Sequence, residues 1–347
     1  MKLMIIRRVV THLFPGYFAM VMATGVISVA SFLLGLQWVA RALLWVGLAT
    51  YVLLWVLTIL RLIGCTREMC GDLMDHARGP GFFTLVAGTC VLGTDLLVVS
   101  GNYAAAIPLW WLGLILWTLI MYAFFTAVTI RERKPSLQAG INGAWLIATV
   151  ATQSISILAV LISAHMGIQE RTVLFLALCM YLLGCMLYLS IITLIFYRFT
   201  FVKLTTADFT PPYWINMGAV AITTLSGSTL ILHAGQWPVL GGLLPFLKGF
   251  TLFFWVTATW WIPLLFILLV WRHLYRRFPV IYDPQYWGMV FPLGMYTTGT
   301  LRLTQAINLP VLESIPRYFI YVALVAWAAA FAGLLHHLQR QARALFS

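Results

Sequence analysis

The sequence predicts an all-α integral membrane protein with ten transmembrane helices. Three observations support this prediction: the composition, the length of the apolar segments and an alternation in their polarity. Of the 347 residues, 62% are hydrophobic and 9% are charged, whereas an ordinary soluble domain carries about 25% charged residues. So few charges cannot build a surface that faces water, so lipid must cover much of the chain.

Ten apolar segments are each long enough to cross a bilayer, which takes about 20 residues per helix. Within the bilayer a helix satisfies all of its own backbone polar groups, so helices are the expected form. Six prolines lie in or near a first helical turn, where the missing N–H costs nothing. We expect one transmembrane domain over 1–347 with short tails at both ends. The segments are 13–36, 39–62, 80–100, 108–130, 138–164, 172–198, 211–233, 245–270, 284–303 and 316–338.

Basic residues set the expected orientation. Most of the 21 Lys and Arg residues, including Lys2, Arg7 and Arg8, fall on the side that holds both termini. The positive-inside rule then places both termini in the cytoplasm of a multi-pass plasma (inner) membrane protein. The net charge of +12 is spread over clusters between apolar runs, so we expect no nucleic acid partner. The five cysteines form no CxxC pair, so neither a metal nor a cofactor is expected.

Polarity alternates along the chain. The odd-numbered segments contain more than twice as many Gly, Ser, Thr, Asn and Gln residues as the even-numbered ones. Small and polar residues belong where helices pack closely or line water. Five consecutive hairpins, each with an inner and an outer helix, would satisfy this pattern. A plain packed bundle with small residues at its interfaces is the alternative.

Uncharged polar side chains on the odd segments are candidates to line a passage for a small anion. Hydroxyl groups can donate to an anion without the full charge that would trap it, and conduction requires release. The alternative is that these hydroxyls bond to a carbonyl in their own helix. The candidates are Thr24, Ser28, Thr84, Thr89, Thr149, Thr152, Gln153, Asn216, Thr223, Ser226 and Thr298.

The segment 284–303 holds a candidate gate near its middle. Phe291 precedes Pro292, which cannot donate a hydrogen bond and frees the carbonyl of Gly288, so a kink is expected. Gly288 and Gly294 would leave room for movement. A bulky ring beside a kink can act as a hydrophobic gate, and ordinary core packing is the alternative.

Asp95 is the one acid placed clearly inside a predicted span. An isolated buried charge is costly, so a partner, water or protonation is expected. Arg302 lies near the same end of another odd segment, so an Asp95–Arg302 ion pair is the first interpretation. Proton coupling through Asp95 is the alternative.

Three stretches resemble one known family. They are Phe14–Gly25, Pro212–Ala219 and Val290–Tyr296, and they are similar to the tellurite-resistance/dicarboxylate transporter family. That family also contains plant slow anion channels, a yeast sulfite efflux pump and a fungal malate permease. The resemblance implies five hairpins around a central pore, odd helices inside, and a homotrimer with one pore per subunit. It also implies that Phe291 plugs the pore.

Two functions compete at this stage. The first is an anion channel or passive transporter for small inorganic or organic anions, gated by an aromatic plug. The second is a proton-coupled transporter or exporter of sulfite, tellurite or C4-dicarboxylates, in which Asp95 would carry the proton. An enzyme is not expected, because the acids outside Asp95 lie in loops and the GxxxxGK[ST], HExxH and GxSxG motifs do not occur.

Overall fold

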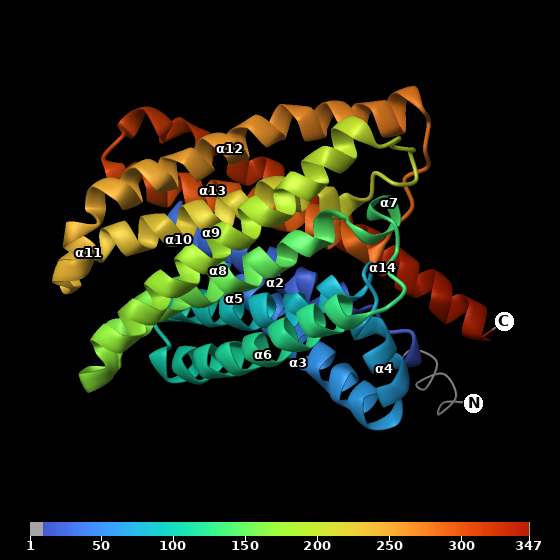
Figure 1. The fold of residues 1–347 in the computed structure, drawn as a ribbon, viewed down its shortest axis with the longest axis horizontal. Coiled ribbons are helices and arrows are strands. Elements are labelled where there is room, and N and C mark those ends of the chain that lie inside the picture. The colour runs from blue at the N-terminus through green and yellow to red at the C-terminus, as the bar shows by residue number, and fades with distance from the viewer. Residues whose placement is uncertain (1–9, 347) are drawn as a thin grey trace.

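Ten long helices run side by side in the computed structural model, which describes residues 10–346 (Figure 1). The first helix of each successive pair is inner, and the second is outer. The inner helices are α2 (Ala19–Leu33), α5 (Phe83–Ser100), α8 (Ile147–Ile162), α10 (Ile215–Leu232) and α13 (Trp287–Ile307). The outer helices are α3 (Gln37–Gly64), α6 (Tyr103–Ile130), α9 (Glu170–Phe201), α12 (Leu244–Val270) and α14 (Ser314–Phe346). No strand occurs among the described residues.

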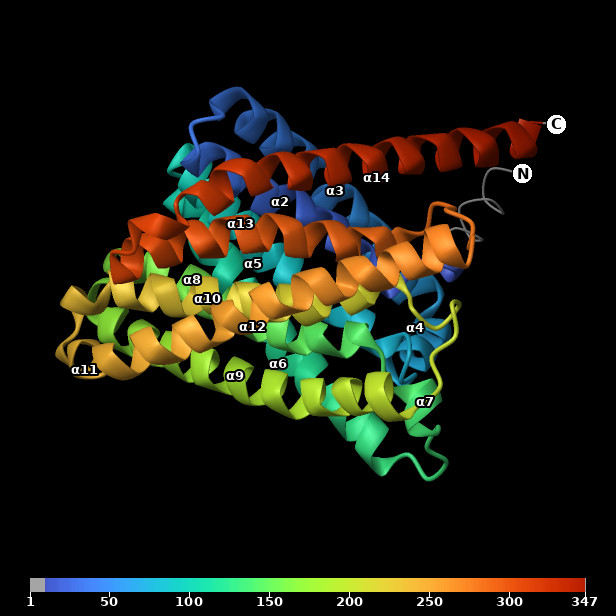
Figure 2. The ribbon, with the colours of Figure 1, turned by 90° about the horizontal axis from the view of Figure 1, so that it is seen from above.

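The inner helices form a closed ring. Contacts run from α2 to α5, α8, α10 and α13 in turn, and α13 packs back against α2. Each inner helix also packs against the outer helix of its own hairpin. In the fourth hairpin the chain passes through the short α11 (Pro238–Gly242) between α10 and α12. Figure 2, which views the helices from the side, shows α14 along one edge of the bundle and α9 along the opposite edge. Five hairpins therefore lie around one axis.

The two layers differ in burial as their composition predicts. Four inner helices are 83–94% buried along their most apolar stretch, whereas the outer helices are 17–44% buried. Nine helices among the described residues are long and apolar enough to cross a membrane. The tenth, α13, has 21 residues, or about 31 Å of helix. Its lower hydropathy reflects a helix covered by protein rather than lipid, and its crossing stays a prediction.

Each inner helix is entered through a short 3-10 turn. These turns are Pro15–Phe18, Gly79–Phe82, Gly143–Leu146, Pro211–Trp214 and Pro284–Tyr286. Four carry Pro at a first position, as the sequence predicts. The exception among the predicted starts is Pro108, which lies inside α6, because Asn102 caps that helix earlier by accepting from the amide of Ala105 at 3.0 Å.

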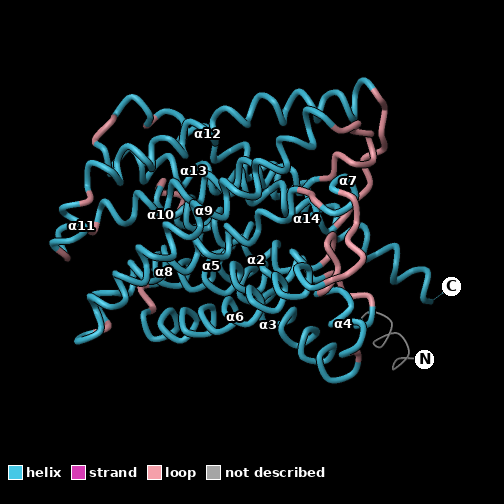
Figure 3. The backbone as a smooth tube through the Cα atoms, viewed as in Figure 1, coloured by secondary structure: helices cyan, strands magenta, loops and turns pink. Residues whose placement is uncertain are grey.

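The five turns contact one another in a ring and lie at the end of the molecule where most of the loops gather (Figure 3). We call it the basic end. Three arginines at the ends of outer helices are buried there, and each donates to a carbonyl two residues before the 3-10 turn of its own hairpin. The pairs are Arg61 with Leu13 O (2.9 Å), Arg198 with Ile141 O (2.7 Å) and Arg272 with Phe209 O (2.5 Å).

These arginines close hairpins 1, 3 and 4 in the same way. Basic residues that indicate the orientation of the chain therefore also hold the starts of three inner helices in place. The predicted contribution of Lys2, Arg7 and Arg8 lies outside the described residues.

Candidate functional site

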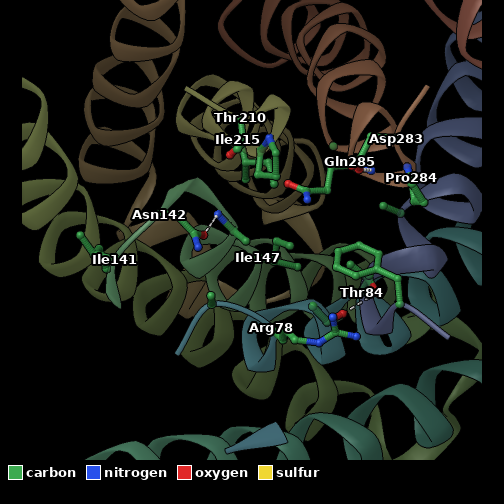
Figure 4. Close-up of a pocket in the computed structure, with 18 of the residues that line it drawn as sticks. Arg78, Thr84, Ile141, Asn142, Ile147, Thr210, Ile215, Asp283, Pro284 and Gln285 are labelled. Atoms are coloured by element: carbon green, nitrogen blue, oxygen red, sulfur yellow. Dashed lines mark hydrogen bonds between the residues drawn. The ribbon is translucent and has the colours of Figure 1, made fainter. Parts of the chain in front are cut away.

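A cavity of about 570 Å³ opens at the basic end, in the middle of the ring. We call it the entrance cavity. The start of every inner helix contributes to its wall, through Gly16, Gly81, Ala144, Pro212 and Pro284. Figure 4 shows Arg78, Asn142, Thr210 and Gln285 around this space. Five helix N-termini thus meet at one opening.

The charged side chains of the entrance cavity are balanced. Arg78 and Arg198 line it together with Asp208 and Asp283. Arg78 lies 2.6 Å from Asp72, and Arg198 lies 3.6 Å from Asp208. Hydrogen bonds from Thr205, and then the nearby Arg198, lower the pKa of the Asp208 carboxyl, so it is ionised at neutral pH. Side chains alone give the opening little net charge.

The helix N-termini supply the positive potential that the side chains do not. Each N-terminus carries about half a positive charge from the dipole of its helix. Asn142 and Asp283 cap two of the 3-10 turns by accepting from backbone amides at 2.8 Å. The other three turns have no side-chain cap and carry Pro at a first or second position. Because Pro has no backbone N–H, the dipole of the inner helix that follows each turn supplies the positive potential there. The arrangement favours an anion at the opening.

Asn142 and Gln285 were missed as candidates by the sequence analysis. Asn142 occupies the N-cap position of its turn. Gln285 lies two positions after Asp283, which is the N-cap of its turn. Both positions come just before an apolar inner segment, where Asn and Asp are typical caps. That signal could have pointed to them.

Phe291 lines the inner part of the entrance cavity and is 1% exposed. Met295 and Thr298 lie about one and two turns further along α13. They line a second, much smaller void of about 20 Å³, roughly the room for one water. Each inner helix gives two residues to this central void: Val26, Val29, Val91, Thr94, Ser154, Ile157, Ile222, Leu225, Met295 and Thr298. The axis of the ring is therefore narrow and largely apolar beyond Phe291.

The neighbours of Phe291 pack tightly. Gly218 of α10 receives the ring of Pro292, since a Cβ there would lie 2.7 Å from it. A Cβ on Gly294 would lie 2.7 Å from Ile27 of α2. Gly294 therefore permits close helix packing and does not leave the free space that we expected, because α2 fills it. Only Gly288 lines the cavity without such a close contact.

Two of the eleven predicted lining residues border a cavity, Thr84 at the entrance and Thr298 at the central void. Several of the others meet the outer layer instead. Aromatic side chains of outer helices bond to inner hydroxyls: Tyr51 with Thr89 (3.0 Å), Trp117 with Thr152 (2.8 Å) and Trp327 with Thr24 (2.9 Å). An indole or phenol in a lipid-covered layer needs a polar partner, and these hydroxyls provide it.

The remaining candidates also lie away from the two cavities. Ser28 donates to Ala40 O, Gln153 to Tyr181 O, Ser226 to the Ser156 hydroxyl and Thr223 to Ala219 O in its own helix. Thr149 and Asn216 are fully buried, and their side-chain polar atoms have no hydrogen-bond partner among the described residues.

Asp95 and Arg302 do not pair. Arg302 donates to Gln305 at 2.9 Å. Asp95 is fully buried, and neither carboxylate oxygen has a hydrogen-bond partner among the described residues. Its Oδ2 lies on the side of α5 that faces Gly25 of α2, and Arg302 bonds to Gln305 instead, so the expected ion pair does not form in this structure.

Comparison with known proteins indicates the family of this chain. Residues 12–335 match the model of the voltage-dependent anion channel family. The chain is 40% identical over 154 residues to an uncharacterized membrane protein of Mycobacterium tuberculosis, covering 44% of this chain and 77% of that one. It is also 24% identical over 327 residues to an uncharacterized transporter of Methanocaldococcus jannaschii, covering 92% of both chains. A second uncharacterized transporter of that organism is 24% identical over 295 residues, covering 82% and 83%.

Proposed function

Because this chain belongs to the voltage-dependent anion channel family, whose members transport anions across membranes, we propose that it is a passive anion pathway gated by Phe291. Small inorganic or organic anions enter at the basic end and pass along the axis of the inner ring. Phe291 separates the entrance cavity from the central void and must move aside for passage. The protein would lie in the plasma membrane as a homotrimer with both termini cytoplasmic.

One observation carries this proposal. The entrance cavity joins five helix N-termini and ends at a buried phenyl ring, and a void lined by all five inner helices follows on the same axis. An anion is stabilised at the opening by the N-terminal dipoles. An apolar constriction blocks conduction while it stays dry. The balanced charges of the entrance keep binding weak enough for release.

The test is anion flux in liposomes that contain the purified protein. Phe291→Ala should raise the current carried by chloride or nitrate, because it removes the ring from the axis. The current should reverse at the Nernst potential of the anion. The permeability order among chloride, nitrate, sulfite and malate then gives the substrate class.

Phe254→Ala is the matched control. Phe254 is a fully buried phenyl ring on the outer helix α12, packed against Tyr188 and Phe250. Its truncation leaves a comparable void away from the axis. A Phe291→Ala flux no higher than that of wild type, in a folded variant, would contradict the gate. An equal rise in both variants would point to nonspecific leak.

Asp95 supports a second candidate, a proton-coupled transporter. A fully buried carboxyl without an ion pair costs little only when it is protonated, so it can take up and release a proton. Asp95→Asn should then abolish uptake driven by a pH gradient and preserve exchange at equal pH. Uptake that survives in Asp95→Asn would exclude Asp95 as the coupling residue.

A further inference from the structure

A second large cavity lies on the outside of the molecule, between α12 and α14. It has a volume of about 690 Å³, within the range of cavities that bury a small ligand. Its walls include Phe266 and Val270 of α12, and Ala330 and Gly333 of α14. Met289 and Val290 of α13 also line it, so the inner ring is reached there from the lipid side. We call this cavity the α12–α14 groove.

The groove is apolar along its length and basic at one end. His273, His336, His337 and Arg340 line it near the basic end of the molecule. Of the described residues that line it, none is acidic. A ligand that fits must therefore carry a long apolar part and an anionic group at one end.

The loop between α12 and α13 also lines the groove, with apolar side chains and a hydroxyl group. Val280 and Ile281 of this connection are apolar but strongly exposed, at 74% and 70%. Next to them, the Tyr282 hydroxyl accepts from the Trp287 indole at 3.2 Å, which leaves its own proton available to a phosphate. Burial raises the pKa of Tyr282 to about 12, so this proton is present at neutral pH.

We propose that the α12–α14 groove binds an anionic phospholipid of the leaflet at the basic end. One acyl chain lies against Phe266, Val270 and Ala330, and the phosphate meets Arg340, Tyr282 and the histidines. Basic pockets between transmembrane helices are suited to anionic headgroups, and the apolar walls face the hydrocarbon region. The proposal does not rest on the transport function.

The lipid would contact the helix that carries the gate. Met289 and Val290 line the groove, and the next residue, Phe291, lines the entrance cavity on the other side of α13. The groove and the pore thus share one stretch of α13.

The test measures which lipids stay bound. Protein in nanodiscs of phosphatidylcholine mixed with phosphatidylglycerol is released and analysed by native mass spectrometry. Wild type should retain phosphatidylglycerol in excess over the surrounding mixture. Arg340→Gln should lower that preference about fivefold, which corresponds to about 1 kcal/mol for one basic residue near an anionic surface. Ala330→Trp should remove the retained lipid by filling the groove.

Two matched variants serve as controls. Arg133→Gln removes one exposed charge from the connection before α7 (Leu137–Gly140), which lies across the molecule from α14 in Figure 2. Ala328→Trp adds the same ring to an exposed position of α14 outside the groove. Both should keep the preference of wild type.

The proposal is overturned if wild type retains the two lipids in the ratio of the mixture, or if Arg340→Gln and Ala330→Trp keep the preference. It is also overturned if Ala330→Trp changes the oligomeric mass and leaves lipid retention as in wild type, because the groove would then be an interface between copies of the chain.

Discussion

The direction in which inner hydroxyls point can be tested by comparing Thr24 with Thr298. Both are buried threonines on inner helices, and both were candidates to line the pore. Thr24 accepts a hydrogen bond from Trp327 of the outer layer, whereas Thr298 lines the central void and donates to Gly294 O of its own helix. Valine has the shape of threonine, so Thr→Val removes the hydroxyl and leaves no cavity.

The two substitutions should affect different quantities. Interhelical hydrogen bonds in membrane proteins contribute about 0.6 kcal/mol on average and up to about 1.7 kcal/mol. Thr24→Val also leaves the indole N–H of the partly buried Trp327 without this acceptor, so the free energy of unfolding should fall by about 1–2 kcal/mol. Thr298→Val breaks only a bond within its own helix, and its effect on unfolding should be under about 0.5 kcal/mol.

Anion flux should show the opposite order. In the Phe291→Ala background the central void becomes the narrowest part of the axis. We expect the Thr298 hydroxyl to turn from Gly294 O toward a passing anion. Removing it then takes away a hydrogen bond to a charged species of about 1.5 kcal/mol, which slows passage roughly tenfold. Thr24→Val in the same background should leave flux within about twofold, because Thr24 faces α14.

Reversible unfolding in mixed micelles and liposome flux measure the two effects. A double-mutant cycle of Thr24→Val with Trp327→Phe should give a coupling energy of about 1 kcal/mol. The reasoning is refuted if Thr24→Val slows flux as much as Thr298→Val, or if the cycle shows no coupling.

Two more predictions concern packing and pH. Gly299→Ala should reduce the free energy of unfolding, because the new Cβ would lie 2.8 Å from a backbone oxygen of α10. Gly249→Ala meets open space on α12 and should stabilise the helix by up to about 1 kcal/mol. Equal unfolding midpoints of the two variants would contradict this prediction. The hydrogen bonds from Thr205 and the nearby Arg198 lower the pKa of Asp208 in the folded state. They therefore stabilise the fold at pH values above the unfolded pKa of about 3.8, and this stabilisation is lost as the pH falls through the lower folded pKa. Asp208→Asn should therefore be less stable than wild type at neutral pH and equally stable in strong acid, and a constant difference across the pH series would exclude this account.

The layered architecture could be predicted because lipid and protein select different residues. A helix against lipid is uniformly apolar, while one covered by protein tolerates polar groups, so α5 and α10 can be told from α6 and α12 by composition. For the same reason, the hydropathy of α13 is too low to mark this helix as a membrane span. Its Thr297, Thr298 and Thr300 are compatible with a helix enclosed by others, and this lowers the signal that marks a span.

The rotation of each helix about its own axis could not be predicted. Thr24 meets Trp327, which lies 303 positions away in the chain, and no local pattern indicates that contact. Asp95 and Arg302 were expected to pair because both lie toward the same end of odd segments, but position along a helix does not fix the direction in which a side chain points. Residues that share a level of the membrane can face opposite sides of their helices.

These rotations change the physical account of selectivity. A ladder of hydroxyls along the pore would select anions by hydrogen bonding over the whole path. In this structure four of the nine hydroxyl-bearing candidates, Thr24, Ser28, Thr89 and Thr152, bond to the outer layer. Thr94, Ser154 and Thr298 are the hydroxyl-bearing residues at the central void. Under the function that we propose, the strongest attraction for an anion lies at the basic end, where five helix N-termini meet. Discrimination between anions then depends mainly on how easily each one loses water at the narrow, largely apolar axis beyond Phe291.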